Sequence, residues 1–261
     1  MTNMLEFDAD AARKVQAVYT TADVVRQREA VLSAVDVKPG EHVLDVGVGP
    51  GFLAAELAAA VGSSGRVCGI DISDDMLAIA ARRSVRPGSA RVELSHGSAT
   101  EIPFDNESFD LVTCTQVLEY VSDVPAALGE FHRVLRPGGR LLVLDTDWDT
   151  IVWHSADEQR TSRVLGAWAQ HLADPHLPRT LGRSLSTAGF EVATPFVLTL
   201  LSTGYHPETY SGGLIGIVAS FVVGRDGLTE HDVNSWVADL TEMGPAYFFS
   251  LNRYVFGATK A

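Results

Sequence analysis

Three glycines at alternate positions follow an acidic residue and a short apolar run. Gly47, Gly49 and Gly51 come after Asp45 in the segment EHVLDVGVGPGF (41–52). Glycine permits sharp turns and lets a ligand approach the main chain closely, and the N–H groups of the helix that follows can bind an anionic group. The segment therefore predicts a loop that binds a nucleotide-type ligand.

Two acidic residues indicate the chemistry of that ligand. Asp45 would repel a pyrophosphate but favours a cationic group, such as an ammonium or a sulfonium. The dinucleotide pattern G-x-G-x-x-G fails, because its third glycine would fall on Phe52. Asp71 ends a second apolar run, twenty positions after Gly51, where an acidic residue can bind ribose hydroxyls. An adenosine ligand with a positively charged tail is favoured.

Five motifs occur in a fixed order between residues 37 and 147: VLDVGVGPG, GIDIS followed by Met76, GSATEIPFDNESFDLV, QVLEYVSD and ALGEFHRVLRPGGRLLVLD. Together they resemble the class I S-adenosylmethionine-dependent methyltransferases, especially the small-molecule branch related to the ubiquinone and menaquinone methyltransferases. The resemblance implies S-adenosylmethionine as the cofactor and methyl transfer to a small, partly hydrophobic metabolite. The acceptor atom, whether oxygen, nitrogen or carbon, stays open.

The resemblance also implies the residues that bind the cofactor. Asp45 and the three glycines would contact its methionine end, and Asp71 its ribose. Further contacts with the adenine or the methionine part are implied for Ile72, Met76, Ser98, Ala99 and Gln116. Ser98 departs from the family, which usually has aspartate there, so its hydrogen bond to the adenine amino group would lack charge assistance.

The elements that position these residues alternate between strand and helix. Strands are predicted near 42–46, 66–70, 91–95, 109–114 and 140–145, and helices near 51–61, 74–82, 123–134 and 178–188. We therefore expect an α/β fold with a Rossmann-like, seven-stranded, mostly parallel sheet and helices on both faces. The segments 190–201 and 253–258 are expected as a sixth strand and a final edge strand. Ligands bind at the carboxyl ends of such strands, where the signature residues fall.

Two further segments are expected to cover the core, which comprises 37–201 and 251–261. By resemblance to the family, residues 1–36 form a helical lid over the cofactor, with Tyr19 and Arg28 as its contacts. A surface helix packed on the sheet is an equal alternative. Residues 202–250 form a cap insertion, because they are too many for a plain loop.

The acceptor half of the site is less well marked. Aromatic residues after the fifth strand and in the cap are expected to line an apolar pocket, although Trp236 and Phe248 could equally be core. The others are Trp148, Trp153, Trp168, Tyr205, Tyr210, Phe221, Tyr247 and Phe249. His154 is the first candidate for a base, with Asp147 to orient it, and the rival bases are His171 and His176.

Composition limits the other functions of the 261-residue chain. A net charge of −13 argues against binding to nucleic acid or to an anionic membrane surface. The longest apolar stretch, 213–223, is too short to span a bilayer, and no signal peptide is apparent. A cytoplasmic monomer or homodimer is expected. No metal is expected, because Asp145, Asp147 and Asp149 share one side of a strand without a histidine or asparagine set nearby.

Two other functions stay open beside methyl transfer. The chain could bind the cofactor and catalyse a rearrangement or cyclisation in its apolar pocket without transferring a methyl group. Retained cofactor without a methylated product would favour that function. A nicotinamide dehydrogenase is disfavoured by Asp45 and by the missing third glycine.

Overall fold

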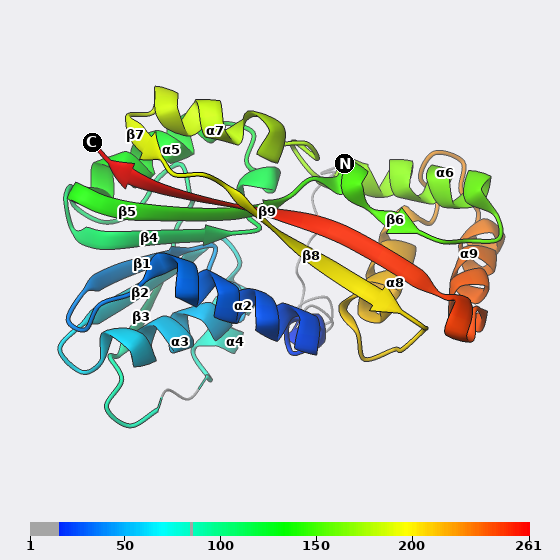
Figure 1. Ribbon diagram of the computed structural model, residues 1–261, viewed down its shortest axis with the longest axis horizontal. Coiled ribbons are helices and arrows are strands. Elements are labelled where there is room, and N and C mark those ends of the chain that lie inside the picture. Colours follow the sequence, from blue (N-terminus) through cyan, green and yellow to red (C-terminus); the bar gives the residue numbers. More distant parts are fainter. Residues whose placement is uncertain (1–15, 84–85) are drawn as a thin grey trace.

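The computed structural model describes residues 16–83 and 86–261, and a single mixed sheet runs through it (Figure 1). The strand order is β3-β2-β1-β4-β5-β9-β6, and β7 and β8 also pair with β9. Strands β1 to β5 pair in parallel, whereas β9 is antiparallel to each of its neighbours. The strands are β1 (His42–Val46), β2 (Arg66–Asp71), β3 (Val92–His96), β4 (Phe109–Thr115), β5 (Leu135–Thr146), β6 (Val152–Trp153), β7 (Phe190–Val192), β8 (Phe196–Thr203) and β9 (Phe248–Lys260).

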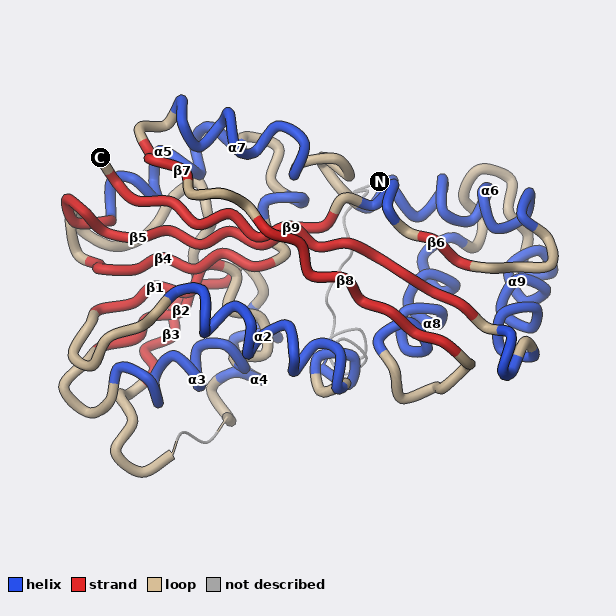
Figure 2. Tube along the Cα trace, in the orientation of Figure 1, coloured by secondary structure: helices blue, strands red, loops and turns tan. Residues whose placement is uncertain are grey.

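Helices cover both faces of the parallel part of the sheet (Figure 2). They are α2 (Ala22–Val35), α3 (Phe52–Val61), α4 (Asp74–Ala80), α5 (Val124–Val134), α6 (Glu158–Trp168), α7 (Pro178–Thr187), α8 (Tyr210–Val222) and α9 (Glu230–Glu242). Four short 3-10 turns accompany them: η1 (Leu118–Tyr120), η2 (Trp148–Thr150), η3 (Ala169–His171) and η4 (Gly244–Ala246). The parallel core that the alternation predicts is thus present.

Local capping explains where several helices begin. The Ser73 side chain accepts a hydrogen bond from the Met76 N–H at the start of α4, and Asp123 does the same for α5. Thr229 and Asp232 form a reciprocal capping box at the start of α9. Each cap satisfies an N–H group that has no partner within the helix.

The buried apolar side chains form three clusters. One packs α5 and α7 against one face of the sheet, and a second packs α2 and α3 against the other face. The third lies among α6, α8, α9 and the first half of β9. In Figure 1 these last helices gather around the half of β8 and β9 that extends away from β1–β3. The chain therefore adds a helical lobe to the parallel core.

Two expectations about the late strands are wrong. The segment 190–201 is two strands, β7 and β8, and Pro195 lies in the break, where it cannot donate a ladder hydrogen bond. The segment 253–258 is part of the long strand β9, which is no edge strand, because β5 pairs with one side of it and β7 and β8 with the other. The sheet therefore has nine strands and not seven.

The insertion is shorter than 202–250, because β8 continues to Thr203 and β9 begins at Phe248. It consists of α8, α9 and η4. Among residues 16–83 and 86–261, no helix combines the length and apolar character needed to cross a membrane.

Candidate active site

The glycine loop connects β1 to α3 with a backbone that requires glycine. Gly47, Gly49 and Gly51 have φ values of 68°, 50° and 76°, in the left-handed region. A Cβ atom added to Gly47 would lie 2.2 Å from a methyl carbon of Val117, and one added to Gly51 would lie 2.9 Å from the Cβ of Ala80. Gly47 and Gly51 are therefore fixed by close packing as well as by backbone conformation.

Asp71, at the end of β2, holds the glycine loop in place. Its Oδ2 accepts a hydrogen bond from the Gly49 N–H at 2.9 Å, and its Oδ1 accepts one from the Ser73 N–H at 2.9 Å. Burial raises the pKa of Asp71, although these two N–H groups oppose the shift. The strand end, the loop and the start of α4 are thus joined through one carboxylate.

Asp45 is a nearly buried carboxyl group at the end of β1. Its side chain is 2% exposed, and its Oδ1 accepts a hydrogen bond from the Thr113 hydroxyl at 2.7 Å. Burial is the main cause that raises its pKa, to about 7, and the charge of Asp71 adds to the shift. A buried carboxylate with one hydroxyl partner is stabilised by a cation, so this position suits a positively charged ligand group.

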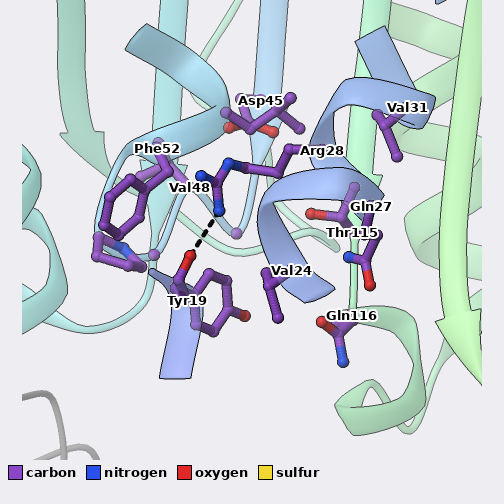
Figure 3. A pocket seen from close by; sticks show the side chains of 14 residues that line it. Tyr19, Val24, Gln27, Arg28, Val31, Asp45, Val48, Phe52, Thr115 and Gln116 are labelled. Carbon is purple, nitrogen blue, oxygen red and sulfur yellow. Dashed lines mark hydrogen bonds between the residues drawn. The ribbon is translucent and has the colours of Figure 1, made fainter. Parts of the chain in front are cut away.

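A pocket opens between the glycine loop, α2 and the end of β4 (Figure 3). Its lining residues are Tyr19, Val24, Gln27, Arg28, Val31, Asp45, Gly47, Val48, Gly49, Pro50, Phe52, Leu53, Thr115 and Gln116. Arg28 donates hydrogen bonds to the Tyr19 carbonyl oxygen at 2.7 Å and to a Glu56 carboxylate oxygen at 3.2 Å. The pocket thus presents a guanidinium on one wall and the Asp45 carboxyl on another. Tyr19 and Arg28 are the two residues that the sequence places in the lid.

The remaining residues assigned to the cofactor lie beyond the pocket lining, apart from Gln116. Ile72 is 61% exposed immediately after Asp71, whereas Met76 and Ala99 are buried. The Ser98 hydroxyl lies 2.9 Å from that of Thr100 and accepts a hydrogen bond from the Thr100 N–H. The Ser98 hydroxyl is therefore held by its own turn, with one acceptor site of its oxygen occupied by the Thr100 N–H.

The two residues assigned to catalysis do not meet at the pocket. His154 follows β6 with an exposed side chain, and its main-chain N–H donates to the Phe248 carbonyl oxygen. Asp147 is bound instead by Arg179, whose Nε donates to its Oδ2 at 2.7 Å. Burial alone would raise the pKa of Asp147, but the hydrogen bonds from Arg179 and from the Asp149 N–H bring it below its usual range. In the described part of the chain, no hydrogen bond or ion pair joins His154 to Asp147.

One assumption behind the expectation of no metal is wrong, because the fold brings His176 to Asp147 and Asp149. The candidate ligand atoms of these three residues lie within 4.8 Å of one another. Arg179 donates to both carboxylates, at 2.7 Å to each. Its guanidinium already supplies the positive charge that a metal ion would bring, so we read the group as an ion-pair network.

The aromatic residues that follow β5 and those of the insertion come together in the third cluster. It holds Trp148, Trp153, Trp168, Tyr210, Trp236, Tyr247 and Phe249. Trp236 is fully buried core, as the alternative interpretation allowed, whereas Phe248 is 38% exposed. His171 is buried against Trp168, and its burial lowers its pKa to about 4, so it is neutral near pH 7.

Three buried charged residues near the site are not assigned to it from the sequence. Glu119 and Asp145 are completely buried, and Arg253 is 1% exposed. Asp145 is considered from the sequence only as a metal ligand. The available signal is a single charged residue within an apolar run, VLEYV for Glu119 and LNRYVF for Arg253.

Known protein sequences are similar to part of this chain. Residues 44–143 match the family described as Methyltransferase domain. An uncharacterized 37.1 kDa protein in transposon TN4556 of Streptomyces fradiae is 39% identical over 185 residues, 69% of this chain and 52% of that protein. A demethylmenaquinone methyltransferase of Bacillus cytotoxicus is 40% identical over 125 residues, 48% of this chain and 53% of that protein. The chain thus spans about half the length of these relatives.

Solved structures share the fold. A phosphoethanolamine N-methyltransferase of Haemonchus contortus in complex with S-adenosyl-L-methionine has a TM-score of 0.62 at 20% identity, over 97% of this chain and 57% of that one. The [4+2]-cyclase SpnF has a TM-score of 0.59 at 25% identity, over 91% of this chain and 81% of that one. The Rossmann-like fold expected from the alternation is confirmed.

Proposed function

The chain belongs to the class I S-adenosylmethionine-dependent methyltransferases, and from this premise we propose that it transfers a methyl group from S-adenosylmethionine to a small, partly hydrophobic metabolite. The observation that carries the proposal is the pocket that joins the glycine loop to a buried carboxyl group and a guanidinium. Its charges match an amino-acid end attached to a cationic sulfur.

The pocket residues fit the methionine end of the cofactor. The Asp45 carboxylate would bind the ammonium group, and its charge also favours the sulfonium. Arg28 would bind the carboxylate, because its guanidinium lines the same pocket. Gly47 and Gly49 line the pocket without side chains, so their main chain can lie close to this ligand. Gln116 would contact the methionine part from the end of β4.

The residues at the ends of β2 and β3 fit the adenosine end. Asp71 retains acceptor capacity on each carboxylate oxygen after its bonds to Gly49 and Ser73, and would bind the ribose hydroxyls. The exposed Ile72 side chain would be covered by the adenine ring, with Met76 and Ala99 beneath it. Ser98 would contribute one neutral hydrogen bond at the adenine edge.

S-adenosylmethionine, when bound, supplies an electrophilic methyl group on a positively charged sulfur. The protein residues bind the donor, orient the acceptor and keep water away. Helix α2 would help to keep water away, because its residues Val24, Gln27 and Val31 line the pocket. Val24, which lines the pocket and belongs to the third apolar cluster, would contact an acceptor with an apolar body. His154 as a base, assisted by Asp147, stays a prediction from the sequence, and its exposed position gives it no support.

A second candidate is catalysis of a cyclisation or rearrangement with the cofactor bound but unused. The likeness to the cyclase SpnF favours it, since that enzyme shares the fold over most of this chain. Both candidate functions require the pocket to bind the cofactor, and they differ in whether the methyl group is transferred from the cofactor to another molecule.

The test incubates the protein with methyl-labelled S-adenosylmethionine and the small-molecule fraction of a bacterial extract. The proposal predicts label in an extractable product with the natural protein, and none with Asp45→Ala. Cofactor binding without label transfer would favour the second candidate. Failure to bind S-adenosylhomocysteine would contradict both.

A further inference from the structure

Three buried acidic or basic side chains lie on elements next to the pocket, and the pairing of Asp145 with Tyr254 and of Thr146 with Arg253 places Asp145 and Arg253 on opposite faces of the sheet. Glu119 lies on η1, Asp145 near the end of β5, and Arg253 in the middle of β9. The Glu119 Oε2 accepts hydrogen bonds from the Trp148 indole N–H at 3.1 Å and from the Thr146 N–H at 3.3 Å. The Asp145 Oδ1 accepts one from the Val117 N–H at 3.1 Å. Glu119 and Asp145 are thus each held through one of their two carboxylate oxygens.

One polar atom of each side chain has no hydrogen-bond partner within residues 16–83 and 86–261. These atoms are the Glu119 Oε1, the Asp145 Oδ2 and the Arg253 Nε. Leaving a charged group buried without its full set of partners costs about 1–3 kcal/mol or more. Native proteins rarely accept this cost without a reason such as ligand binding or catalysis. Glu119 and Arg253 therefore offer one acceptor and one donor to a ligand.

Glu119 and Arg253 are connected to the wall of the cofactor pocket. Gln27 lines the pocket, and its side-chain oxygen accepts a hydrogen bond from the Arg253 Nη1. Gln116 lines it two residues before η1, on the segment that carries Glu119. Figure 3 shows Tyr19, Gln27 and Gln116 around the pocket. A ligand between Glu119 and Arg253 would thus lie next to the methionine end of the cofactor.

Aromatic rings and titratable groups surround Glu119 and Arg253. Arg253 lies over the ring of Tyr210, 4.7 Å from its centroid, and Tyr210 belongs to the third apolar cluster. The titratable groups that face Glu119 are Asp145, Arg253, and the tyrosines Tyr19, Tyr120 and Tyr210. Burial raises the pKa of Glu119 to about 7 and that of each of these tyrosines above its usual range. Glu119 can thus gain or lose a proton near neutral pH, whereas the tyrosines stay protonated.

We propose that Glu119 binds the methyl acceptor and takes up its proton, and that this acceptor is a flat, apolar molecule with an ionisable hydroxyl group. This inference rests on the proposed function. The acceptor oxygen uses a lone pair to bond to the methyl carbon, and the electrons of the broken sulfur–carbon bond remain on sulfur. The hydroxyl proton passes to the Glu119 Oε1. The Arg253 Nε donates to the oxygen while it carries negative charge.

The same geometry disfavours a protonated amine as the acceptor. An ammonium group has only donors, so it could pair with Glu119 but would leave the Arg253 Nε without an acceptor. A hydroxyl group, in contrast, donates to Glu119 and accepts from Arg253, so it satisfies both unpaired atoms at once.

Dicyclohexylcarbodiimide tests the proposal, because this small apolar reagent modifies protonated carboxyl groups, which mass spectrometry of peptides then locates. At about pH 6, below the raised pKa values, Glu119 and Asp45 should both be modified, whereas the exposed Glu101 should not. S-adenosylhomocysteine should protect Asp45 and leave Glu119 reactive. Adding p-cresol should then protect Glu119 at least about fivefold, whereas 4-methylanisole, its methyl ether, should not.

Each outcome separates the two proposals. Asp45 modification that S-adenosylhomocysteine leaves unchanged would contradict the proposed function. An unmodified Glu119, modification of Asp145 alone, or equal protection by p-cresol and its ether would overturn the inference.

A matched pair of variants gives a second measurement, p-cresol binding to the S-adenosylhomocysteine complex by calorimetry. Glu119→Gln keeps an acceptor for Trp148 and Thr146, so it should fold while binding p-cresol about tenfold more weakly. Glu101→Gln should bind it as the natural protein does. Equal affinity in the two variants would overturn the role of Glu119.

Discussion

The carboxylate of Asp71 accepts a hydrogen bond of 2.9 Å from the main-chain N–H of Gly49, 22 residues earlier in the chain. The same carboxylate that would bind the ribose thus also fixes the loop that would face the methionine end. Asp71→Ala should therefore weaken S-adenosylhomocysteine binding by about tenfold to a hundredfold, because both the ribose hydroxyls and the Gly49 N–H lose a charged acceptor. Calorimetric titration measures this loss. Asp75→Ala, at an exposed position on α4, is the matched control, and equal affinity in the two variants would contradict the assignment.

Asp45 makes cofactor binding depend on pH. Burial raises its pKa to about 7, and only the ionised carboxylate attracts a cationic ligand. The affinity for S-adenosylhomocysteine, whose ammonium group stays charged, should therefore fall by about tenfold for each pH unit below 7 and level off above it. Titrations between about pH 5.5 and 8.5 measure this slope. Asp45→Asn should abolish it, and a flat profile in the natural protein would show that Asp45 does not contact the cation.

The same carboxyl group should lower the stability of the ligand-free protein. Because its folded pKa is raised above the unfolded value of about 3.9, the folded state binds the proton more tightly. The stabilising effect of protonation is full at acid pH and is lost as pH rises toward 7. The free energy of unfolding of Asp45→Asn, relative to that of the natural protein, should thus increase by about 1–4 kcal/mol as the pH rises from about 4 to about 8. This gain is about 2–4 °C in Tm per kcal/mol. Thermal unfolding at both pH values checks it, and a pH-independent difference would contradict the account.

Gly47 should tolerate substitution less well than Gly49. Both have positive φ, but a Cβ atom at Gly47 would lie 2.2 Å from Val117, whereas one at Gly49 has nothing closer than 3.9 Å. Gly49→Ala should cost about 1–2 kcal/mol of backbone strain, and Gly47→Ala should cost clearly more. Adding Val117→Ala to the Gly47→Ala variant should recover part of the lost free energy of unfolding. It removes the contact with the Val117 side chain but not the strain of the positive φ angle. Denaturant unfolding measures all four proteins, and equal losses in the two glycine variants would refute the close contact.

The glycine loop and its flanking elements could be predicted because their signals are local. Val43, Leu44 and Val46 mark a buried strand, and the glycines after Asp45 mark the turn into α3. The caps at Ser73 and Thr229 are equally local, since each is decided within four residues. The parallel pairing of β1 to β5 follows from the alternation of strand and helix along the chain.

The position of β9 and the buried charged residues could not be predicted, because they depend on distant contacts. The apolar run of β9 does not reveal that β5 will pair with one side and β8 with the other. Arg253 bonds to Gln27 from 226 residues away, and His176 reaches Asp147 through a loop without a motif. His154 as a base stays a prediction that rests on sequence distance from a strand end, and its exposed side chain lies away from the pocket lining.

The central claim is that this pocket binds S-adenosylmethionine, and calorimetric titration of the purified protein with S-adenosylhomocysteine tests it most directly, with NAD as the control. The account predicts saturable binding of S-adenosylhomocysteine at one site and no binding of NAD, since Asp45 would repel a pyrophosphate. Binding of NAD, or of neither ligand, would contradict it.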